Sequence, residues 1–577
     1  MIRSFEPAYS GNNRWNTILR WSTLCAISLS CILVLAYRLD AAPDIFMDEI
    51  IYYRAAFNLA THGNLTWDRS PIFVHPPIHF LTQALFLDLV GLNQGFQPFT
   101  GTYVVRLVNV LAAAVSAGLL FLLVERLSNL RTATVVSLFL LLDPFVVRIN
   151  RRNMLETMAE MWVLAAIFAY WHYRDRLNLR NILTIGLLFG FSLLTKELVF
   201  FQFMTLPIFM VLSGRWQHLK KLLLIGGIAF CIWLLFPFWA WSLGQWSEFL
   251  ANKAYNFDRL RGTVQITGWN REGVSFINAL NVNLFQYGTS YLMIVLGAST
   301  TALLFFIGRN ERARFIVAWN LTAFAFFAYT VAFGTINDQF FYFLMVPVIV
   351  MNFYILMAWV DRLAGYAIPT EPIASGIIAL TYPDTSFARS RLVKWLKWLD
   401  GYLAILTGWL MEIGQVVLRK SMLSKALLAL ILTSGLSLQT YNAYRWVTLY
   451  VMESDNSLFQ LSSYIKANIP LGTKINSMFD TGEPTLDLML PGYKIVSLRR
   501  QSEIEDQQVE YAVLSSKNLW GRYGKITPDY YDWVTKNGTL LFSTYGNSFW
   551  QVSLYKLQLG NPKDSNYVAH VLQPSNP

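Results

Sequence analysis

Long apolar runs, separated by short polar and basic segments, dominate the chain up to about residue 440. A transmembrane α-helix needs about 20 mostly apolar residues to cross a hydrocarbon core about 30 Å thick. The expected fold class is therefore a polytopic α-helical membrane protein with about 11 to 13 transmembrane helices. We predict one span in each of the apolar runs at 16–37, 103–124, 132–147, 157–171, 181–194, 198–213, 222–243, 289–307, 316–333, 340–360 and 426–438.

The segment 38–102, between the first two runs, carries two shorter helical patterns. MDEIIYYRAAFNLATHG predicts a helix from about Asp48 to Thr61 that ends at Gly63, because glycine is the usual residue at a helix C-cap. HFLTQALFLDLVG, residues 79–91, would rise only about 20 Å as a helix, which is too short to span a bilayer. We therefore expect two juxtamembrane helices in a first outer loop.

The pattern is interrupted at residues 361–421, which contain three prolines and the basic segment RSRLVKWLKW. This composition favours a cytoplasmic connection with a basic amphipathic helix at the membrane surface. A hairpin of two further spans would keep the same alternation of sides, so both interpretations stay open.

The tail has a different character from the rest of the chain. SLFQLSSYIKANIP predicts an amphipathic helix, and TKINSMF, YKIVSL, EYAVLSS and FWQVSLYKL predict short strands. We predict a transmembrane domain over residues 1–445 and a small extracytoplasmic α/β domain over residues 446–577. The tail shows no catalytic motif, so we expect a structural or acceptor-handling role for it.

Composition and charge agree with a membrane location. The 577 residues are 55% hydrophobic and 14% charged, whereas soluble domains carry about 25% charged residues. The net charge of +11 comes from basic clusters between apolar runs, which is the positive-inside pattern, and it does not indicate a nucleic-acid partner. With Arg3, Arg14 and Arg20 on the cytoplasmic side, the first loop and the tail lie outside. We expect a multi-pass protein of a prokaryotic plasma membrane.

One predicted outer loop, RINRRN, contradicts the charge rule with Arg148, Arg151 and Arg152. Anchoring to lipid headgroups would explain these arginines, and so would binding of an anionic ligand.

The acids at the start of the first juxtamembrane helix also allow two interpretations. Asp48 and Tyr52 are four residues apart and share a helix face, while Glu49 is rotated by about 100°. Acids at a helix N-terminus stabilise it by up to about 1 kcal/mol, which is a purely structural explanation. It does not explain the next element, PIFVHPPIHF, whose two prolines fix an extended elbow that presents His75.

At this point the sequence resembles the GT-C glycosyltransferases of the protein O-mannosyltransferase and lipid A aminoarabinose transferase superfamily. The resemblance covers about residues 15–360, and its first part is a D-E-x-x-Y motif, a P-P elbow, a short helix that ends in glycine and an arginine at the second span: Asp48, Glu49, Tyr52, His75, Pro76, Pro77, Gly91 and Arg106. Its later part is similar in RRNMLETMAE, TKE and QFFYFLMVPVI, which contain Glu156, Lys196 and Tyr342.

Two departures from the family pattern affect the expected substrate. His75 stands where the aminoarabinose transferases have Lys, and Val74 stands where they have Glu. We therefore expect a different donor sugar. The chain also has no room for the inserted β-trefoil domain of eukaryotic protein mannosyltransferases.

The resemblance implies transfer of a sugar from a polyprenyl-phosphate carrier to an acceptor hydroxyl of a protein, a lipid or a cell-envelope glycan, with inversion. Asp48 would be the general base, with Glu49 as a helper or acceptor-orienting group. Tyr52, Glu156 and Tyr342 would shape the site. The leaving phosphate would need cations in a partly desolvated site, and the candidates are His75, Arg148, Arg151, Arg152 and Lys196.

The sequence shows no His/Cys cluster with the spacing of a zinc site, and it leaves open whether Mg²⁺ or Mn²⁺ takes part. Asp48, Glu49 and Glu156 would be the ligands of Mg²⁺ or Mn²⁺ if a metal takes part. Two rival functions are a transporter or flippase of a lipid-linked or anionic substrate, and a non-catalytic assembly subunit. Transporters place ionisable groups at mid-span and show internal repeats, whereas here these groups lie at span ends. A non-catalytic subunit would be expected to lack the acid at position 48.

Overall fold

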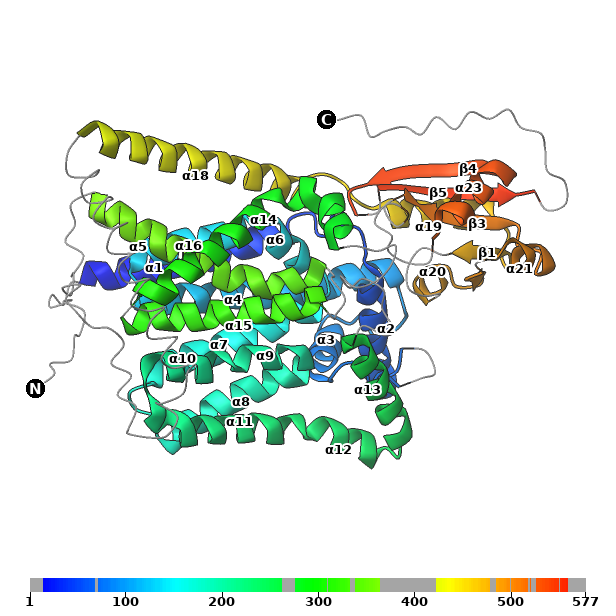
Figure 1. Cartoon of the computed structure of the whole chain (residues 1–577). Coiled ribbons are helices and arrows are strands. Elements are labelled where there is room, and N and C mark those ends of the chain that lie inside the picture. The colour runs from blue at the N-terminus through cyan, green and yellow to red at the C-terminus, as the bar shows by residue number, and fades with distance from the viewer. Residues whose placement is uncertain are drawn as a thin grey trace, which may run out of the picture.

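The computed structural model describes residues 14–67, 71–261, 276–308, 310–332, 338–363, 422–477, 484–498, 500–516, 519, 526–548 and 550–558. It consists of a bundle of helices with a small sheet domain at one end (Figure 1). The predicted cytoplasmic connection lies outside the described residues, except for its first three positions, which complete the last turn of a bundle helix ending at Leu363.

The bundle contains the predicted apolar helices together with two 3₁₀ turns, η1 (Glu197–Val199) and η2 (Trp216–His218). Its helices are α1 (Arg14–Ala36), α4 (Pro98–Leu127), α5 (Leu130–Leu141), α6 (Pro144–Asn150), α7 (Leu155–Tyr173), α8 (Leu179–Thr195), α9 (Phe200–Phe203), α10 (Thr205–Ser213), α11 (Leu219–Trp233), α12 (Leu235–Ser242), α14 (Phe276–Ile307), α15 (Glu311–Ala332), α16 (Asp338–Leu363) and α18 (Met422–Val451).

Length and composition identify six membrane-spanning helices in the described part of the chain, or seven if α5 and α6 form one bent span. The predicted class of a polytopic α-helical membrane protein is confirmed. The predicted lower limit of 11 spans is reached if α7, α8, the stretch 197–213 and α18 are added to those seven.

The run predicted as one span over 132–147 is not a single straight helix, because it bends between α5 and α6. The axes of α5 and α6 differ by 67°. Pro144 is the first residue of α6, and the Asp143 carboxylate caps that helix by accepting a hydrogen bond from Val146 N at 3.0 Å. Proline cannot donate the backbone hydrogen bond of a continuous helix and clashes with the preceding turn. The break redirects the RINRRN segment toward the first loop.

Both predicted juxtamembrane helices are present as α2 (Met47–His62) and α3 (Ile78–Leu89). Gly63 ends α2 in the left-handed conformation, at φ 68°. A third juxtamembrane helix, α13 (Trp246–Leu260), forms where the sequence predicted only a loop at 244–288, and α14 starts well before the predicted residue 289. Helix α13 is amphipathic: Phe249 packs on Phe73 and Phe236, while most neighbouring side chains are exposed. It contains no long apolar run, so a search for such runs does not find it.

The tail forms the predicted small α/β domain. Its helices are α19 (Ser457–Asn468), α20 (Pro484–Met489), α21 (Gln501–Asp506) and α23 (Pro528–Asn537), and its strands are β1 (Lys474–Ser477), β2 (Lys494–Val496), β3 (Tyr511–Ser515), β4 (Gly538–Gly546) and β5 (Trp550–Leu557). The strand order is β2-β1-β3-β5-β4, with β1 parallel to both neighbours and β5 antiparallel to both. Sequence analysis missed β4, an edge strand whose side chains do not alternate cleanly between buried and exposed.

The sheet domain and the first loop meet at the same end of the bundle. Figure 1 shows α2, α3 and α13 at this end, next to the domain built from α19 to β5. The two parts share an apolar core, because Ile45 and Ile50 of the first loop are buried among residues of the tail such as Leu458, Leu461 and Ile465. The candidate site lies in this region.

Candidate active site

Asp48 occupies the second position of α2, one helical turn before Tyr52, and its side chain is half-buried. The Tyr52 hydroxyl and His75 Nε2 are hydrogen-bonded at 3.1 Å, and the two rings meet edge to face with centroids 5.6 Å apart. Tyr52, which the helical spacing predicts on the same face of α2 as Asp48, therefore points toward the P-P elbow.

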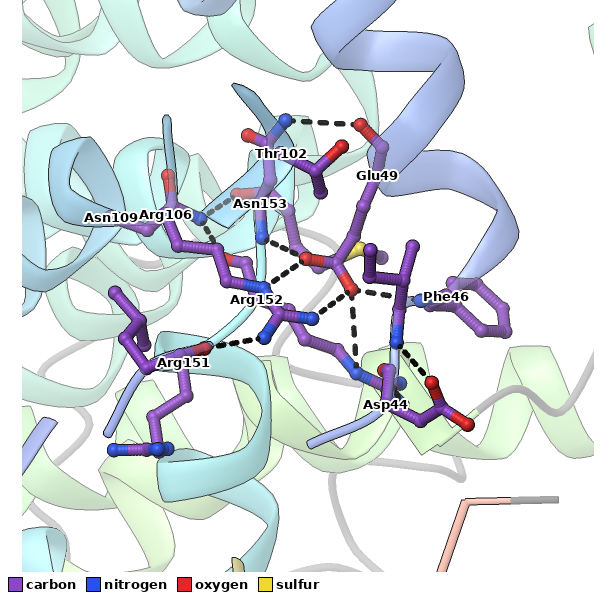
Figure 2. Close-up of polar contacts among 12 residues, drawn as sticks. Asp44, Phe46, Glu49, Thr102, Arg106, Asn109, Arg151, Arg152 and Asn153 are labelled. Atoms are coloured by element: carbon purple, nitrogen blue, oxygen red, sulfur yellow. Dashed lines mark hydrogen bonds and ion pairs between the residues drawn. The ribbon is translucent and has the colours of Figure 1, made fainter. Parts of the chain in front are cut away.

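Glu49 has a different environment (Figure 2). Its carboxylate is fully buried and forms a bidentate ion pair with Arg106, in which Nε lies 2.8 Å from Oε2 and Nη2 lies 2.9 Å from Oε1. It also accepts hydrogen bonds at 2.8 Å from the backbone N–H groups of Phe46 and Asn153, and Arg152 Nε lies 3.8 Å from Oε1. These contacts join α2 to α4 and to the segment after α6.

The three arginines of RINRRN are only 4%, 0% and 1% exposed, so they do not present their charges to lipid headgroups. Arg151 is enclosed by the C-terminal end of α1, where backbone carbonyls lack helical partners. Its guanidinium donates to the carbonyl oxygens of Val34, Leu35, Tyr37, Arg38 and Ala42 at 2.7 to 3.2 Å.

The other two arginines contact later parts of the chain. Arg152 donates through Nη2 to the Asp44 carbonyl at 3.3 Å and to the Ser548 hydroxyl of the sheet domain at 3.1 Å. Arg148 donates to the Tyr287 hydroxyl of α14 and lies 5.7 Å from the centre of that ring. The three arginines that the sequence proposes for phosphate binding therefore contact different parts of the fold and do not meet at one point.

Lys196 follows the last residue of α8 and forms an ion pair with Glu156, the second residue of α7. Glu156 is fully buried, and its Oε2 accepts no hydrogen bond from the part of the chain that the structure describes. Tyr342 of α16 is also buried and donates a hydrogen bond at 2.9 Å to Asn150 Oδ1. Ends of α6, α7 and α8 therefore supply a polar group of side chains next to the first loop.

His79 is a member of this region that sequence analysis missed. It is fully buried, it donates from Nε2 to Asn153 Oδ1 at 3.0 Å, and its ring centroid is 6.3 Å from that of Tyr52. Burial, opposed by the hydrogen bond to Asn153 and reinforced by the nearby Lys196 ammonium, lowers the pKa of His79 to about 4. The ring is therefore neutral at physiological pH. The available signal was its position inside PIFVHPPIHF, four residues after His75.

The residues proposed as metal ligands do not fit a metal centre. No group of three or more His, Cys, Asp or Glu side chains is arranged to hold an ion within the described ranges. Both carboxylate oxygens of Glu49 already pair with Arg106, and Glu156 pairs with Lys196. We therefore assign no chemical step to a metal.

Comparison with known proteins gives a family similarity over part of the chain and a fold over nearly all of it. Residues 74–241 match the model of the dolichyl-phosphate-mannose-protein mannosyltransferase family. No curated protein matches the chain. The crystal structure of ArnT from Cupriavidus metallidurans bound to undecaprenyl phosphate is 16% identical, with a TM-score of 0.51 over 96% of this chain and 100% of that one.

Two further structures show the same similarity. The apo state of ArnT has 16% identity and a TM-score of 0.52, over 95% of this chain and 100% of that one. The Archaeoglobus fulgidus oligosaccharyltransferase in complex with Zn and sulfate has 11% identity and a TM-score of 0.51, over 92% of this chain and 72% of that one. The chain therefore has the GT-C fold.

Proposed function

We propose that the protein is an integral membrane glycosyltransferase that moves a sugar from a polyprenyl-phosphate carrier to an acceptor hydroxyl, with inversion at the sugar. The observation that carries this proposal is the half-buried Asp48 on a helix that a buried ion pair, Glu49–Arg106, fixes at the end of a GT-C bundle. The family similarity of residues 74–241 and the undecaprenyl phosphate bound to ArnT support a lipid-phosphate donor.

In the proposed reaction Asp48 is the general base. The acceptor oxygen forms a bond to the anomeric carbon, the bond from that carbon to the phosphate oxygen breaks, and the hydroxyl proton passes to the Asp48 carboxylate. Polyprenyl phosphate leaves with the bonding electron pair. Asp48 lies in the first turn of α2, where the partial positive charge of the helix N-terminus interacts favourably with a carboxylate. General bases contribute roughly 10²- to 10⁴-fold to rate.

For the leaving phosphate we narrow the predicted cations to Lys196 and His75. Both are close to the Asp48 face of α2. His75 is hydrogen-bonded to Tyr52. The Lys196 ammonium is near enough to His79 to lower the pKa of that ring, and the His79 ring meets the Tyr52 ring edge to face. We assign Arg148, Arg151 and Arg152 to bracing, because they contact Tyr287, the carbonyl groups at the end of α1 and Glu49, respectively. Glu156 and Tyr342 then hold the polar groups behind Lys196.

The proposal includes the side of the membrane. The alternation of basic loops puts α2, the RINRRN segment and the sheet domain on the extracytoplasmic side. There a water-soluble hydroxyl of a protein, a lipid or an envelope glycan can meet a donor whose tail stays in the bilayer.

The test is release of polyprenyl phosphate by the purified full chain supplied with a polyprenyl-phosphate sugar. Asp48→Asn should reduce turnover by about 10² to 10⁴ while the protein keeps its melting temperature and still binds donor. The matched control is Asp40→Asn, which neutralises an exposed acid of the same loop and should leave turnover unchanged. A fully active Asp48→Asn enzyme would remove the assignment of the base. Movement of the intact lipid across a bilayer without release of phosphate would identify a flippase instead.

A further inference from the structure

The segment that leads into α2 packs against the sheet domain. Ile45 and Ile50 have no exposed surface and belong to the core formed by Leu458, Leu461 and Ile465 of α19. Two hydrogen bonds join the segments: Asp455 N donates to the Ala41 carbonyl at 2.7 Å, and Asp44 N donates to the side-chain oxygen Oδ2 of Asp455 at 3.1 Å. The first turn of the proposed catalytic helix thus has one side in the bundle and the other in the tail.

Two carboxylates lie at the centre of this junction. Asp44 accepts hydrogen bonds from Leu458 N at 3.1 Å and from the Ser457 hydroxyl. Asp455 accepts two hydrogen bonds from Ser548, from its hydroxyl at 2.7 Å and from its backbone N–H at 3.2 Å. Both acids are buried, at 2% and 1% exposure. Buried carboxylates are retained at a cost unless donors surround them, so the donors fix the relative position of the two segments closely.

Ser548 links this junction to Arg152 and Glu49, which hold the amino end of α2. Its hydroxyl oxygen accepts from Arg152 Nη2 at 3.1 Å, and the same guanidinium reaches the Glu49 carboxylate, with Nε 3.8 Å from Oε1. Figure 2 shows Arg152 between Asp44 and Glu49. Gly546, two residues before Ser548, packs closely against Asp455, because a Cβ added at Gly546 would lie 2.4 Å from Asp455 Oδ1. A contiguous set of contacts therefore runs from Asp455 through Ser548 and Arg152 to the residue next to Asp48.

We infer that the C-terminal sheet domain is a positioning part of the active site, in which Asp455 and Ser548 set the place of the α2 amino end and so of Asp48. This inference rests on the proposed function of Asp48. It replaces the expectation that the tail is only a structural or acceptor-handling cap. A displacement of about 1 Å of a catalytic group can lower rate by about 10²-fold, so the loss of these contacts should appear in turnover more than in donor binding.

The experiment uses Ser548→Ala in the purified full chain, with Ser502→Ala as the matched control. Ser502 is an exposed serine of the same domain, on α21. We expect Ser548→Ala to lower kcat by about 10- to 100-fold and to change the donor KM less than about twofold. Ser548→Thr, which keeps the hydroxyl, should recover part of kcat. The control variant should match the wild type.

A second measurement keeps this inference separate from the proposed function. Hydrogen–deuterium exchange of the peptide containing residues 44–52 should be faster in Ser548→Ala and Asp455→Asn than in the wild type or Ser502→Ala, whether or not a donor is turned over. Unchanged exchange in both variants would overturn the positioning role. A fall in kcat explained entirely by a lower folded fraction would also overturn it. No turnover by wild type, with faster exchange in the variants, would reject only the proposed function.

Discussion

The two acids that open α2 are neighbours in the chain but have opposite environments. Glu49 is sealed against Arg106 and the backbone of Asn153, and its carboxylate is saturated with donors. Asp48 is half-buried on the helix face that carries Tyr52, and the Tyr52 hydroxyl is hydrogen-bonded to His75. The rotation of about 100° per residue separates the two side chains. One acid is buried in an ion pair that holds the helix in place, and the other is the half-buried acid that we propose as the general base.

The comparison extends to the cations on each side of α2. On the Glu49 side, Arg106, Arg151 and Arg152 donate to carbonyls and to one carboxylate inside the protein. On the Asp48 side, Lys196 has one carboxylate partner, Glu156, and lies near a neutral His79. In our proposal the arginine side is a rigid support, and the lysine side receives the phosphate. The predictions for Glu49, Lys196 and Arg151 test this division, and the prediction for Asp44 tests the junction of α2 with the sheet domain.

The largest effect is expected from Glu49→Gln. Removing one member of a buried ion pair typically costs about 3 to 5 kcal/mol, because the other charge stays buried and unpaired. We therefore expect a marked fall in melting temperature. Glu453→Gln, which changes an exposed acid, is the control and should melt like the wild type. A stable Glu49→Gln protein with no turnover would instead move the base from Asp48 to Glu49.

Lys196→Met should act mainly on the donor. Charge-assisted hydrogen bonds to phosphate are strong in a partly desolvated site, so we expect kcat/KM for the polyprenyl-phosphate sugar to fall by about 100-fold, or about 2.7 kcal/mol. The double variant Lys196→Met/Glu156→Gln removes the orphaned acid and should show the same loss. Lys253→Met breaks a comparable pair with Glu197, at 2.6 Å, outside the proposed site. Equal losses in the Lys196 and Lys253 variants would contradict a phosphate role for Lys196.

Local signals predicted the parts of this division that depend on neighbouring residues. Gly63 identified the end of α2, and the two prolines identified the elbow that presents His75. The hydrogen bond between His75 and Tyr52 was not predicted. The sequence could not show which partner an arginine would find. Arg151 was a candidate for phosphate because it lies in a predicted outer loop, but its donors meet the carbonyls at the end of α1, more than 100 residues earlier in the chain. Such a contact depends on packing and not on local pattern.

The same distinction holds for the fold. Spans with long apolar runs and the α/β character of the tail were predictable from period and composition. The bend at Pro144, the helix α13 and the strand β4 were not, although each has a local cause. Hydropathy is averaged over a window, so a single proline changes it little. Short elements without a long apolar run have the same average hydropathy as loops. The junction of Asp44 with Asp455 joins residues 411 positions apart, which no single-sequence pattern reveals.

Arg151→Lys tests whether the arginine side is only a support. Lysine keeps the charge but lacks the planar fork that reaches five carbonyls. Hydrogen bonds from charged groups contribute about 1.5 to 3 kcal/mol, so we expect stability to fall by about 2 kcal/mol with the donor KM unchanged. Thermal melting and donor titration would measure these two quantities. A higher donor KM at an unchanged melting temperature would return Arg151 to the phosphate site.

The smallest effect is a pH dependence at the junction of α2 with the sheet domain. Burial, reinforced by the neighbouring Asp455 carboxylate, raises the pKa of Asp44 to about 8 in the folded protein, against about 3.9 in an unfolded chain. A carboxyl with a raised folded pKa keeps its proton in the native state after the unfolded chain has lost it. Its contribution to stability is therefore complete below about pH 4 and is lost as pH rises toward 8. The other charged or titratable groups near Asp44 are Arg152, Arg106, Glu49 and Tyr103.

The measurement compares melting temperatures of the wild type and Asp44→Asn between about pH 5.5 and 8.5, with Asp40→Asn as the exposed control. Asparagine can still accept from Ser457 and Leu458 but does not titrate, so the wild type should lose a few degrees relative to Asp44→Asn as pH rises. The control should follow the wild type. Equal pH slopes in wild type and Asp44→Asn would mean that Asp44 is already ionised in the junction. The hydrogen bonds from Ser457 and Leu458 would then outweigh burial, and the junction would hold α2 equally well at every pH.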